Sequence, residues 1–496
     1  MDAVLCDELI EEILQRVPSS SSPSVSLVSK RWLFLLRSAT TSLSLRIPIQ
    51  NPSNLSTDAS TNTNTTASLL SNILSHYPFL SSLTIVSSNP EENLTASLPS
   101  SDSLLWSIAN SPCSNLLSDL RFLPDSPVSP AALLAASSSL TRLTSLHITS
   151  LLPLDFRWLT RFPFLKSFAL VNTFSKPINQ NPNLYQNLEI EESEPVISLP
   201  IESISLSGIR AKDRGLGWLW RRCTRLSWLQ LRACEGIGDE PTSTAFSNCL
   251  TGLVGLELRT CRAIADRVLL LAADRSRNLA SLLLYDGGSR DALHLFINRR
   301  GAALRTLDLR LPLDLHNDHL LAMAGEESGL AALRLQSCCL VTGDGLRSLA
   351  RAPAGAAIEE LALVNCDVVE REPGLLTFMV QSMRRLRRVD LSHNETLSDK
   401  EIGAMLASCQ NLVEIRLRGC RVLTDASLDS LMKHCSKTLE IIDITRCAGV
   451  GGNAIERLLG EMNQLRGVTI EENKVSEGAK AIAAQKGINI SSLDLW

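Results

Sequence analysis

A short phrase is repeated ten times between Leu226 and Asn473: Leu, two residues, an aliphatic residue, one residue, another aliphatic residue, two residues, and then usually Cys or Asn. The copies start at Leu226, Leu253, Leu279, Leu304, Leu330, Ile358, Leu386, Leu412, Leu439 and Leu465, so that successive starts are 25 to 28 residues apart. A fixed period of about 20 to 50 residues is typical of solenoids, in which each repeat contacts only its neighbours. The sequence therefore predicts an extended surface for binding rather than a single catalytic cavity.

One repeat shows how such a surface is built. The alternation Ile415-x-Leu417 has a period of two and predicts a short strand, whereas Leu428 and Leu431 have the spacing of a helix that begins after Thr424. We expect the strands to stack in parallel on the concave side of the array and the helices to lie outside. The repeated phrase resembles the cysteine-containing class of leucine-rich repeats, which implies an α/β solenoid.

Ten of the thirteen cysteines follow the phase of the repeat. Six of them occupy its ninth position: Cys234, Cys261, Cys338, Cys366, Cys420 and Cys447. This spacing, without any C-x-x-C pair, predicts a ladder of buried, reduced thiols rather than disulfides or a zinc site. His316 and His319 form an H-x-x-H pair without a third ligand at a suitable spacing, so no metal, cofactor or catalytic residue is predicted.

Composition excludes several classes of partner. The formal net charge of −4 gives no global field for nucleic acid, and no apolar stretch approaches the length of a membrane span. The first residues lack the basic start and apolar run of a secretory signal, so we expect an intracellular protein of the nucleus, the cytoplasm or both. The five glycosylation sequons, at Asn54, Asn64, Asn93, Asn394 and Asn489, are then incidental.

The first forty residues differ from the repeats. Residues 7–18 predict an amphipathic helix, and residues 25–36 predict a second one. A segment this short does not bury enough apolar surface to fold alone, so either it caps the solenoid or a partner completes it.

The residues themselves favour the partner. Leu5-x-Asp7-Glu8-Leu9, Ile13-Leu14, Val17-Pro18 and the string Ser26-Leu27-Val28-Ser29-Lys30-Arg31-Trp32 resemble the F-box over about residues 3–40. Cys6 departs from the pattern, because F-boxes usually carry Pro there. The resemblance, closest to plant F-box proteins with leucine-rich repeats, implies docking to a Skp-type adaptor and through it to a cullin-RING ubiquitin ligase. The residues assigned to the adaptor contact are Leu5, Leu9, Ile10, Ile13, Leu14, Leu27, Val28 and Trp32.

A substrate is expected on the concave face, at the third, fifth and seventh positions of each repeat. Arginines there flank a more apolar centre at Leu283, Tyr285, Ala362 and Val364, and their planar forks suit carboxylates and phosphates. The alternative is a solvated face whose arginines pair with Glu257, Asp308, Asp390 and Asp443. The predicted substrate-binding residues are Trp228, Arg232, Arg259, Tyr285, Arg310, Arg334, Arg388, Arg416 and Arg418.

These patterns are compatible with three functions. The first is the non-catalytic substrate-recognition subunit of an SCF-type (Skp-cullin-F-box) ubiquitin ligase, which holds an unknown protein substrate. The second is a scaffold that no longer recruits the ligase. The third is an F-box receptor that needs a small molecule, as the auxin and jasmonate receptors do.

We divide the chain into three parts on these patterns. The F-box covers residues 1–40. Irregular leucine-rich repeats, with looser starts at Leu80, Leu117, Leu143, Leu165 and Ile201, cover 41–225 and include polar insertions at 51–66 and 175–198. Regular cysteine-containing repeats cover 226–496 and end in a capping strand that starts at Ile490 and continues through Leu493 and Leu495 to Trp496.

Overall fold

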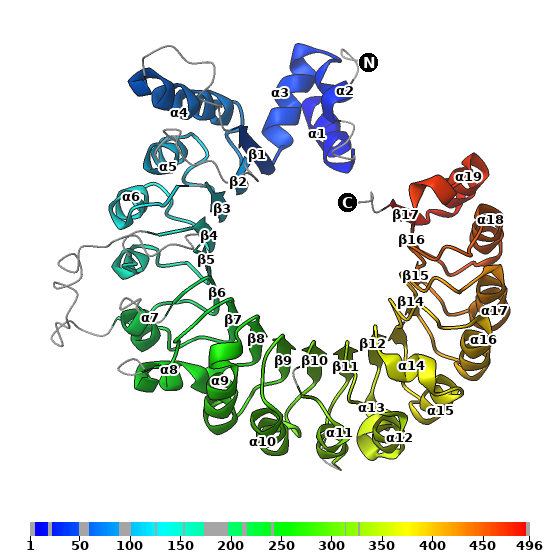
Figure 1. Cartoon of the computed structure of the whole chain (residues 1–496). Helices are drawn as coiled ribbons and strands as arrows, with labels where there is room; N and C mark the ends of the chain where they lie inside the picture. Colours follow the sequence, from blue (N-terminus) through cyan, green and yellow to red (C-terminus); the bar gives the residue numbers. More distant parts are fainter. Residues whose placement is uncertain are drawn as a thin grey trace. The chain divides into compact units, whose positions relative to one another are not determined.

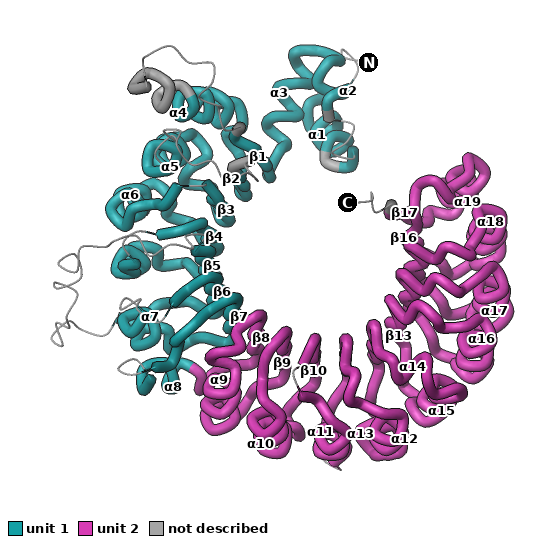
Figure 2. The backbone as a smooth tube through the Cα atoms, in the orientation of Figure 1, with its two compact units in different colours: residues 1–249 teal, residues 250–496 magenta. Residues whose placement is uncertain are grey.

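The computed structural model describes residues 5–17, 22–48, 59–88, 101–124, 126–151, 154–172, 197–210, 216–239, 243–312, 314–325 and 328–492. They divide into two compact units, unit 1 (residues 1–249) and unit 2 (residues 250–496), coloured separately in Figure 2. The boundary predicted at 40/41 rests on the resemblance to the F-box, and the one at 225/226 rests on the regularity of the repeats; both stay predictions.

Unit 1 begins with three helices and continues as a ladder of parallel strands with helices on one side (Figure 1). The strands are β1 (Ser42–Pro48), β2 (Ser82–Ser88), β3 (Asp119–Leu123), β4 (Ser145–Thr149), β5 (Ser167–Val171), β6 (Ser203–Ser207) and β7 (Trp228–Arg232). The helices are α1 (Asp7–Arg16), α2 (Ser22–Ser26), α3 (Lys30–Ala39), α4 (Ala59–Ser75), α5 (Ser101–Ala109), α6 (Pro130–Ala136), η3 (Arg157–Arg161), α7 (Leu216–Arg222) and α8 (Ser243–Cys249).

Unit 2 repeats the same arrangement of strands and outer helices (Figure 1). The strands are β8 (Gly255–Arg259), β9 (Ser281–Tyr285), β10 (Thr306–Arg310), β11 (Ala332–Gln336), β12 (Glu360–Val364), β13 (Arg388–Asp390), β14 (Glu414–Arg416), β15 (Ile441–Asp443), β16 (Gly467–Ile470) and β17 (Asn489–Ser492). The helices are η6 (Leu250–Gly252), α9 (Arg262–Arg275), α10 (Arg290–Arg300), α11 (Asn317–Met323), α12 (Gly343–Arg351), α13 (Pro353–Ala357), α14 (Asp367–Arg371), α15 (Leu375–Ser382), α16 (Asp399–Ser408), α17 (Asp425–Cys435), α18 (Gly452–Glu461), η7 (Glu472–Lys474) and α19 (Glu477–Lys486).

The leucine phrase sets the register of the ladder. In unit 2 the fourth-position residues Leu282, Leu307, Leu333 and Leu361 lie level on adjacent strands, and all four are buried. In unit 1 the looser copies keep the same register, since Ser145, Ser167 and Ser203 lie level at the third position. The predicted leucine-rich-repeat solenoid with an all-helical N-terminal segment is therefore confirmed. Among the described residues, no helix is both long and apolar enough to cross a bilayer.

The eighth position of the repeat ends each strand with an unusual backbone. From Ala233 to Arg446 this residue has a positive φ in nine successive repeats, between 46° and 74°. Gly419 is the single glycine among them, so the other eight repeats hold a side chain in the left-handed region, which costs about 1 kcal/mol each. This cost is offset because contacts with the neighbouring repeats hold the turn in place.

The ninth position satisfies the backbone of the repeat before it. Five of its thiols donate to the sixth-position carbonyl of the preceding repeat, at Sγ to oxygen distances from 3.0 Å for Cys447 to 4.0 Å for Cys338. Burial raises the pKa of Cys420 to about 12 and that of Cys447 to about 11, so both thiols stay protonated and unreactive at neutral pH. The predicted ladder of buried thiols is confirmed.

Asn394 replaces cysteine in this ladder and makes more bonds. Its Nδ2 donates to the carbonyls of Leu363 and Leu391 at 2.8 Å, and its Oδ1 accepts from the Cys366 amide at 2.9 Å. The side chain is buried, so glycosylation at this sequon is incompatible with the fold.

Carboxylates in the first turn of one helix also cap the next repeat. Asp399 of α16 accepts hydrogen bonds from the Thr424 amide at 2.9 Å and the Thr424 hydroxyl at 2.7 Å, and from the Ser427 hydroxyl. Burial alone raises the pKa of Asp399, but the hydrogen bonds from Ser427 and Thr424 outweigh it and hold the pKa below the usual value. The charged form of Asp399 therefore stabilises the fold.

The change Asp399→Ala is expected to lower the free energy of unfolding by about 1–2 kcal/mol at pH 7. Because the pKa of Asp399 is lower in the folded chain, its contribution is complete above the unfolded pKa of about 3.9 and is lost as the pH falls through the folded pKa. Urea unfolding should therefore give a smaller difference between variant and wild type at pH 3 than at pH 7. A constant difference would contradict this origin; the exposed Asp429→Ala serves as the control.

Residues 59–66 of the predicted polar insertion 51–66 form the start of α4, whereas residues 51–58 lie outside the described residues. The reason for this helix is that Leu70 and Leu74, one turn apart, are buried in the array and extend it toward its N-terminus. The predicted loop 175–198 lies outside the described residues except for 197–198.

The predicted register of the last strand is wrong by three residues. Ile490 pairs with Val468, which is the fourth position of its repeat, whereas the prediction placed Ile490 at the first position. The helix α19 ends at Gly487 in a left-handed conformation, so the chain returns to the sheet earlier than the leucine spacing suggests. Residues 493–496, including Trp496, lie outside the described residues.

Candidate functional site

The three N-terminal helices pack around a small apolar core. Ile10, Leu14 and Leu35 form its buried centre, and the partly buried Leu5, Val25, Trp32 and Leu36 pack against them. The predicted second helix is interrupted at residues 27–29, because the Ser29 hydroxyl accepts from the Trp32 amide at 3.2 Å and starts α3. Arg31 then ties α3 to the beginning of α1, donating to the Asp7 carboxylate at 2.8 Å and to the Leu5 carbonyl at 2.9 Å.

This core corrects part of the predicted adaptor contact. Ile10 and Leu14 were expected on an exposed strip, but they are 0% and 5% exposed and belong to the core. Leu5 and Trp32 are also partly covered. The apolar stripe of an amphipathic helix shows only which residues avoid water, and a helix between a core and a partner has to divide such residues between the two.

Among the described residues of this segment, five large apolar side chains are exposed. They are Leu9 and Ile13, one turn apart on α1, Leu27 and Val28 before α3, and Phe34 on α3. Leu27 is 85% and Phe34 is 68% exposed. Phe34 was not predicted, although the unbroken run from Trp32 to Leu36 is wider than one helix face and so requires an outward residue. The departure at Cys6 leaves the backbone unchanged, because its φ of −72° is one that proline adopts.

The arginines of the predicted substrate face in unit 2 are mostly ion-paired. Three of them bind the carboxylate two residues earlier on the same strand: Arg259 binds Glu257 at 3.0 Å, Arg310 binds Asp308 at 2.6 Å and Arg416 binds Glu414 at 2.6 Å. Arg388 binds Glu360 of the neighbouring strand at 2.9 Å. The alternative of a paired face names the correct partners, Glu257 and Asp308, for two of these arginines. The other two are also paired, but with Glu414 and Glu360.

The charges of this face reinforce one another. The hydrogen bond from Arg310 to Asp308 raises the pKa of Arg310, and the charges of Asp308, Glu257 and Asp390 raise it further against the effect of burial. Burial lowers the pKa of Arg416, but the charge and hydrogen bond of Glu414 overcome it, so the pKa is raised.

Arg334 and Asp390 form an ion pair across an intervening strand. Arg334 lies level with Ala362, and Ala362 lies level with Asp390, so the 3.1 Å ion pair passes over Ala362. The small alanine side chain leaves room for the arginine. Ala362 lies under this pair, and both Ala362 and Val364 are buried, so the expectation that they form part of an exposed apolar centre is wrong. Leu283 and Tyr285 are half-buried.

Two predicted arginines differ from the rest. Neither Arg232 of unit 1 nor Arg418 of unit 2 forms an ion pair with any residue that the structure describes, and the Arg418 Nε has no hydrogen-bond partner there. Trp228, on the same strand as Arg232, is 37% exposed. Each unit thus has an arginine on its strand face that is available to a ligand.

The histidine pair has a structural role. The buried His319 accepts from the His316 amide at Nδ1, at 3.1 Å, and its Nε2 lies 3.0 Å from the Arg290 carbonyl of the preceding repeat. Within the described ranges, no group of three or more His, Cys, Asp and Glu side chains is placed to hold a metal ion.

Comparisons with known proteins found one domain match and several similar structures. The F-box domain model matches residues 4–40. Two similar solved structures are the complex of Rad7 and Elc1 from yeast, with 14% identity over 90% of both chains and a TM-score of 0.42, and the leucine-rich repeat-containing protein LegL7 from Legionella pneumophila, with 16% identity, a TM-score of 0.38 and coverage of 53% of this chain and 90% of that one.

The class of protein follows from the domain match and the strand ladder. This chain is a leucine-rich-repeat solenoid that carries an F-box domain at its N-terminus. It is thus an F-box protein with leucine-rich repeats.

Proposed function

We propose that this chain is the substrate-recognition subunit of an SCF-type ubiquitin ligase. In this role the F-box binds a Skp-type adaptor, and the repeats hold a protein substrate near the catalytic subunits. The chain itself contributes positioning rather than chemistry. The observation that supports the proposal best is the F-box at residues 4–40, which leaves Leu9, Ile13, Leu27, Val28 and Phe34 uncovered.

The exposed set suits docking to a partner protein. Five large apolar side chains are exposed on this three-helix segment. If a groove of a partner covers them, the free energy of binding gains about 25 cal/mol for each Å² of apolar surface that is buried. Apolar side chains on short helices are also the usual anchors of helix-in-groove recognition. The adaptor contact we propose therefore omits Ile10 and Leu14 and adds Phe34. It retains Leu9, Ile13, Leu27 and Val28 from the predicted set.

Substrate recognition is proposed for the strand faces. Ion-paired arginines such as Arg259 and Arg310 are engaged within the chain, so a ligand has to displace an existing bond to use them. A ligand displaces no ion pair of the described residues when it binds Arg232 and Trp228 in unit 1 or Arg418 in unit 2. We keep Tyr285, Arg334, Arg388 and Arg416 as candidates because they lie on the same face of the ladder as Arg418.

The proposal predicts loss of adaptor binding in a surface variant. Full-length chain co-expressed with a Skp-type adaptor should form a soluble complex, and Leu27→Asp should weaken it at least about tenfold, because a carboxylate would be buried at the interface. Affinity can be measured by titration calorimetry. Leu69→Asp on α4, also an exposed leucine of unit 1, is the matched control and should bind as the wild type does.

The second candidate, a scaffold without ligase recruitment, predicts a different result. If the folded wild-type chain captures no adaptor, the ligase proposal fails and the scaffold remains. Cys6 favours the scaffold, because F-boxes usually carry Pro at this position. The φ of Cys6 is one that proline adopts, and this favours adaptor binding instead.

A further inference from the structure

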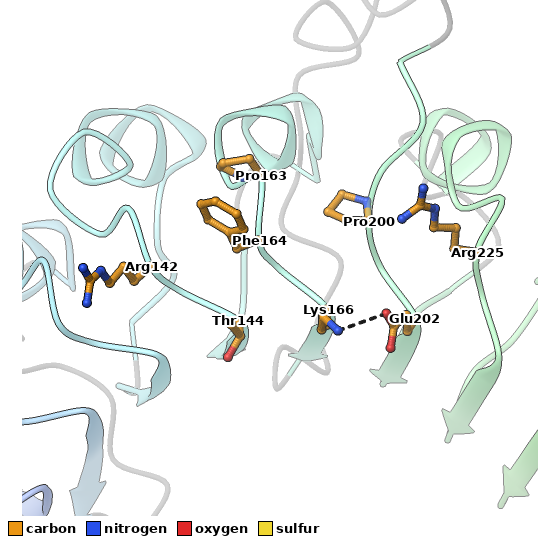
Figure 3. Close-up of a pocket in the computed structure, with 8 residues that line it drawn as sticks. All are labelled: Arg142, Thr144, Pro163, Phe164, Lys166, Pro200, Glu202 and Arg225. Atoms are coloured by element: carbon orange, nitrogen blue, oxygen red, sulfur yellow. Dashed lines mark ion pairs between the residues drawn. The ribbon is translucent and has the colours of Figure 1, made fainter.

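A pocket of about 500 Å³ opens in unit 1, where the chain enters strands β4 to β7 (Figure 3). One row of its lining residues comes from four consecutive repeats: Arg142, Phe164, Pro200 and Arg225. Each of these residues lies three positions before the first residue of its strand, and those first residues are level in the ladder. Each of the four repeats therefore contributes one residue to this row, and an arginine lies at each end of it.

The charge of the pocket is positive. Lys166 and Glu202 form an ion pair at 3.4 Å and largely cancel each other. The exposed side chains of Arg142 and Arg225 form no hydrogen bond or ion pair with residues that the structure describes. Two cations thus remain free to bind an anionic ligand from either end of the row.

The centre of the row is apolar. Phe164 is 59% exposed and lies beside Pro163, and Pro200 continues the apolar surface toward Arg225 (Figure 3). An exposed phenyl ring between two unpaired arginines favours a ligand that has an apolar group between two negative ones.

The local sequence explains why the pocket is here. Along the same edge of unit 1, small hydroxyl side chains at the second repeat position bond to the carbonyl of the preceding repeat. Examples are Ser118 to Ser81 at 3.1 Å, Thr144 to Ser118 at 2.9 Å and Ser227 to Glu202 at 3.0 Å. Lys166 and Glu202 interrupt this series with long side chains that point outward and pair with each other, and the pocket lies at the interruption.

The spacing of the row defines the ligand. Neighbouring strands are about 4.8 Å apart, so the three intervals between the repeats of Arg142 and Arg225 span about 14 Å. An extended peptide rises about 3.3 Å per residue, so four residues cover that span. Residues i, i+2 and i+4 of such a peptide face the same side.

We propose that this pocket binds an extended acidic segment of a protein, with carboxylate or phosphate side chains at i and i+4 and an apolar side chain at i+2. The two anionic groups bind Arg142 and Arg225, and the apolar group packs on Phe164 and Pro200. The inference rests on the proposed function, because it gives the substrate receptor a recognition site on the edge of unit 1 in addition to the strand face.

The test uses the intact chain and a fluorescein-labelled peptide with the core Glu-Ser-Leu-Ser-Glu, followed by fluorescence anisotropy. We expect saturable binding that weakens as salt rises, and at least about tenfold weaker binding when both Glu are replaced by Lys, when Leu is replaced by Ser, or when the Glu residues are moved to i+1 and i+3 with Leu kept at i+2. The variants Arg142→Glu and Arg225→Glu should each lower the affinity about tenfold or more. Arg385→Glu is the matched control, since Arg385 is exposed at the same repeat position in unit 2.

The outcomes separate this inference from the proposed function. The inference fails if the Lys peptide binds as well as the Glu peptide, or if Arg142→Glu and Arg225→Glu behave like Arg385→Glu. It also fails if no peptide binds while the circular dichroism spectrum of the chain is that of a folded protein. Adaptor capture is measured on the same samples: if it is retained when peptide binding fails, only the inference is wrong, and if it is lost while peptide binding follows the prediction, only the ligase proposal is wrong.

Discussion

Replacing Asn394 by alanine should lower the free energy of unfolding of the repeats around it by about 3 kcal/mol. The change leaves the Cys366 amide and the Leu363 carbonyl without the bonds that Asn394 provides, and each such buried group costs about 1–3 kcal/mol. The Leu391 carbonyl suffers less, because it also accepts from the Cys420 thiol at 3.2 Å. Urea unfolding followed by circular dichroism measures the loss, and hydrogen exchange at the Cys366 amide locates it.

Asn394→Cys is the matched control for this variant. A thiol at the ninth position donates to one carbonyl, as Cys366 does to Leu335 at 3.4 Å, but it offers no oxygen to an amide. We therefore expect Asn394→Cys to recover about half of the loss. If alanine and cysteine at this position prove equally stable, the hydrogen bonds of Asn394 do not carry the effect.

Replacing Arg334 by alanine should cost about 2–3 kcal/mol. Asp390 has a side chain only 11% exposed, and without Arg334 it retains the Ser392 amide at 3.0 Å as its hydrogen-bond donor. Removing one partner of a fully buried pair costs about 3–5 kcal/mol. The expected value is lower here because the Arg334 side chain is 25% exposed and water screens its charge.

The pair of Arg388 and Glu360 provides the comparison on the same face. Both of its side chains are more than 40% exposed, so Arg388→Ala should cost less than about 1 kcal/mol. The double variant Arg334→Ala with Asp390→Ala should lose less free energy of unfolding than the two single variants lose in sum, because no unpaired carboxylate remains. Equal losses for Arg334→Ala and Arg388→Ala would contradict the role given to burial.

The repeat positions could be predicted because one period governs several properties at once. The leucines of the fourth and sixth positions, the thiols of the ninth and the strand register all follow from the spacing of 25 to 28 residues. The backbone at the eighth position could not, because the residues there include Ala233, Leu311 and His393 rather than the Gly or Asn that usually mark positive φ. That conformation is imposed by the neighbouring repeats, and a local pattern contains no sign of it.

The candidate sites were predicted less well than the fold. A pattern of apolar residues identified the F-box helices, but it did not separate Ile10, which is buried, from Leu9, which is exposed one residue earlier. The arginines at the third, fifth and seventh repeat positions were placed on the correct strands. The ion pair of Arg334 with Asp390 over Ala362 was not predicted, because it depends on side-chain lengths across three strands. The row of Arg142, Phe164, Pro200 and Arg225 escaped notice because its members belong to repeats with irregular spacing.

The bonds between neighbouring repeats join fixed positions of the repeat, and this restricts how the chain can change in length. Ninth-position thiols such as Cys420 donate to the carbonyl of the preceding repeat, while the Asp399 carboxylate accepts hydrogen bonds from the next one. Gain or loss of one whole repeat preserves every such bond, whereas a few residues inserted between a strand and its ninth position separate a donor from its acceptor. We expect viable length variants to differ by entire repeats or by insertions in the segments that lead from a helix to the next strand.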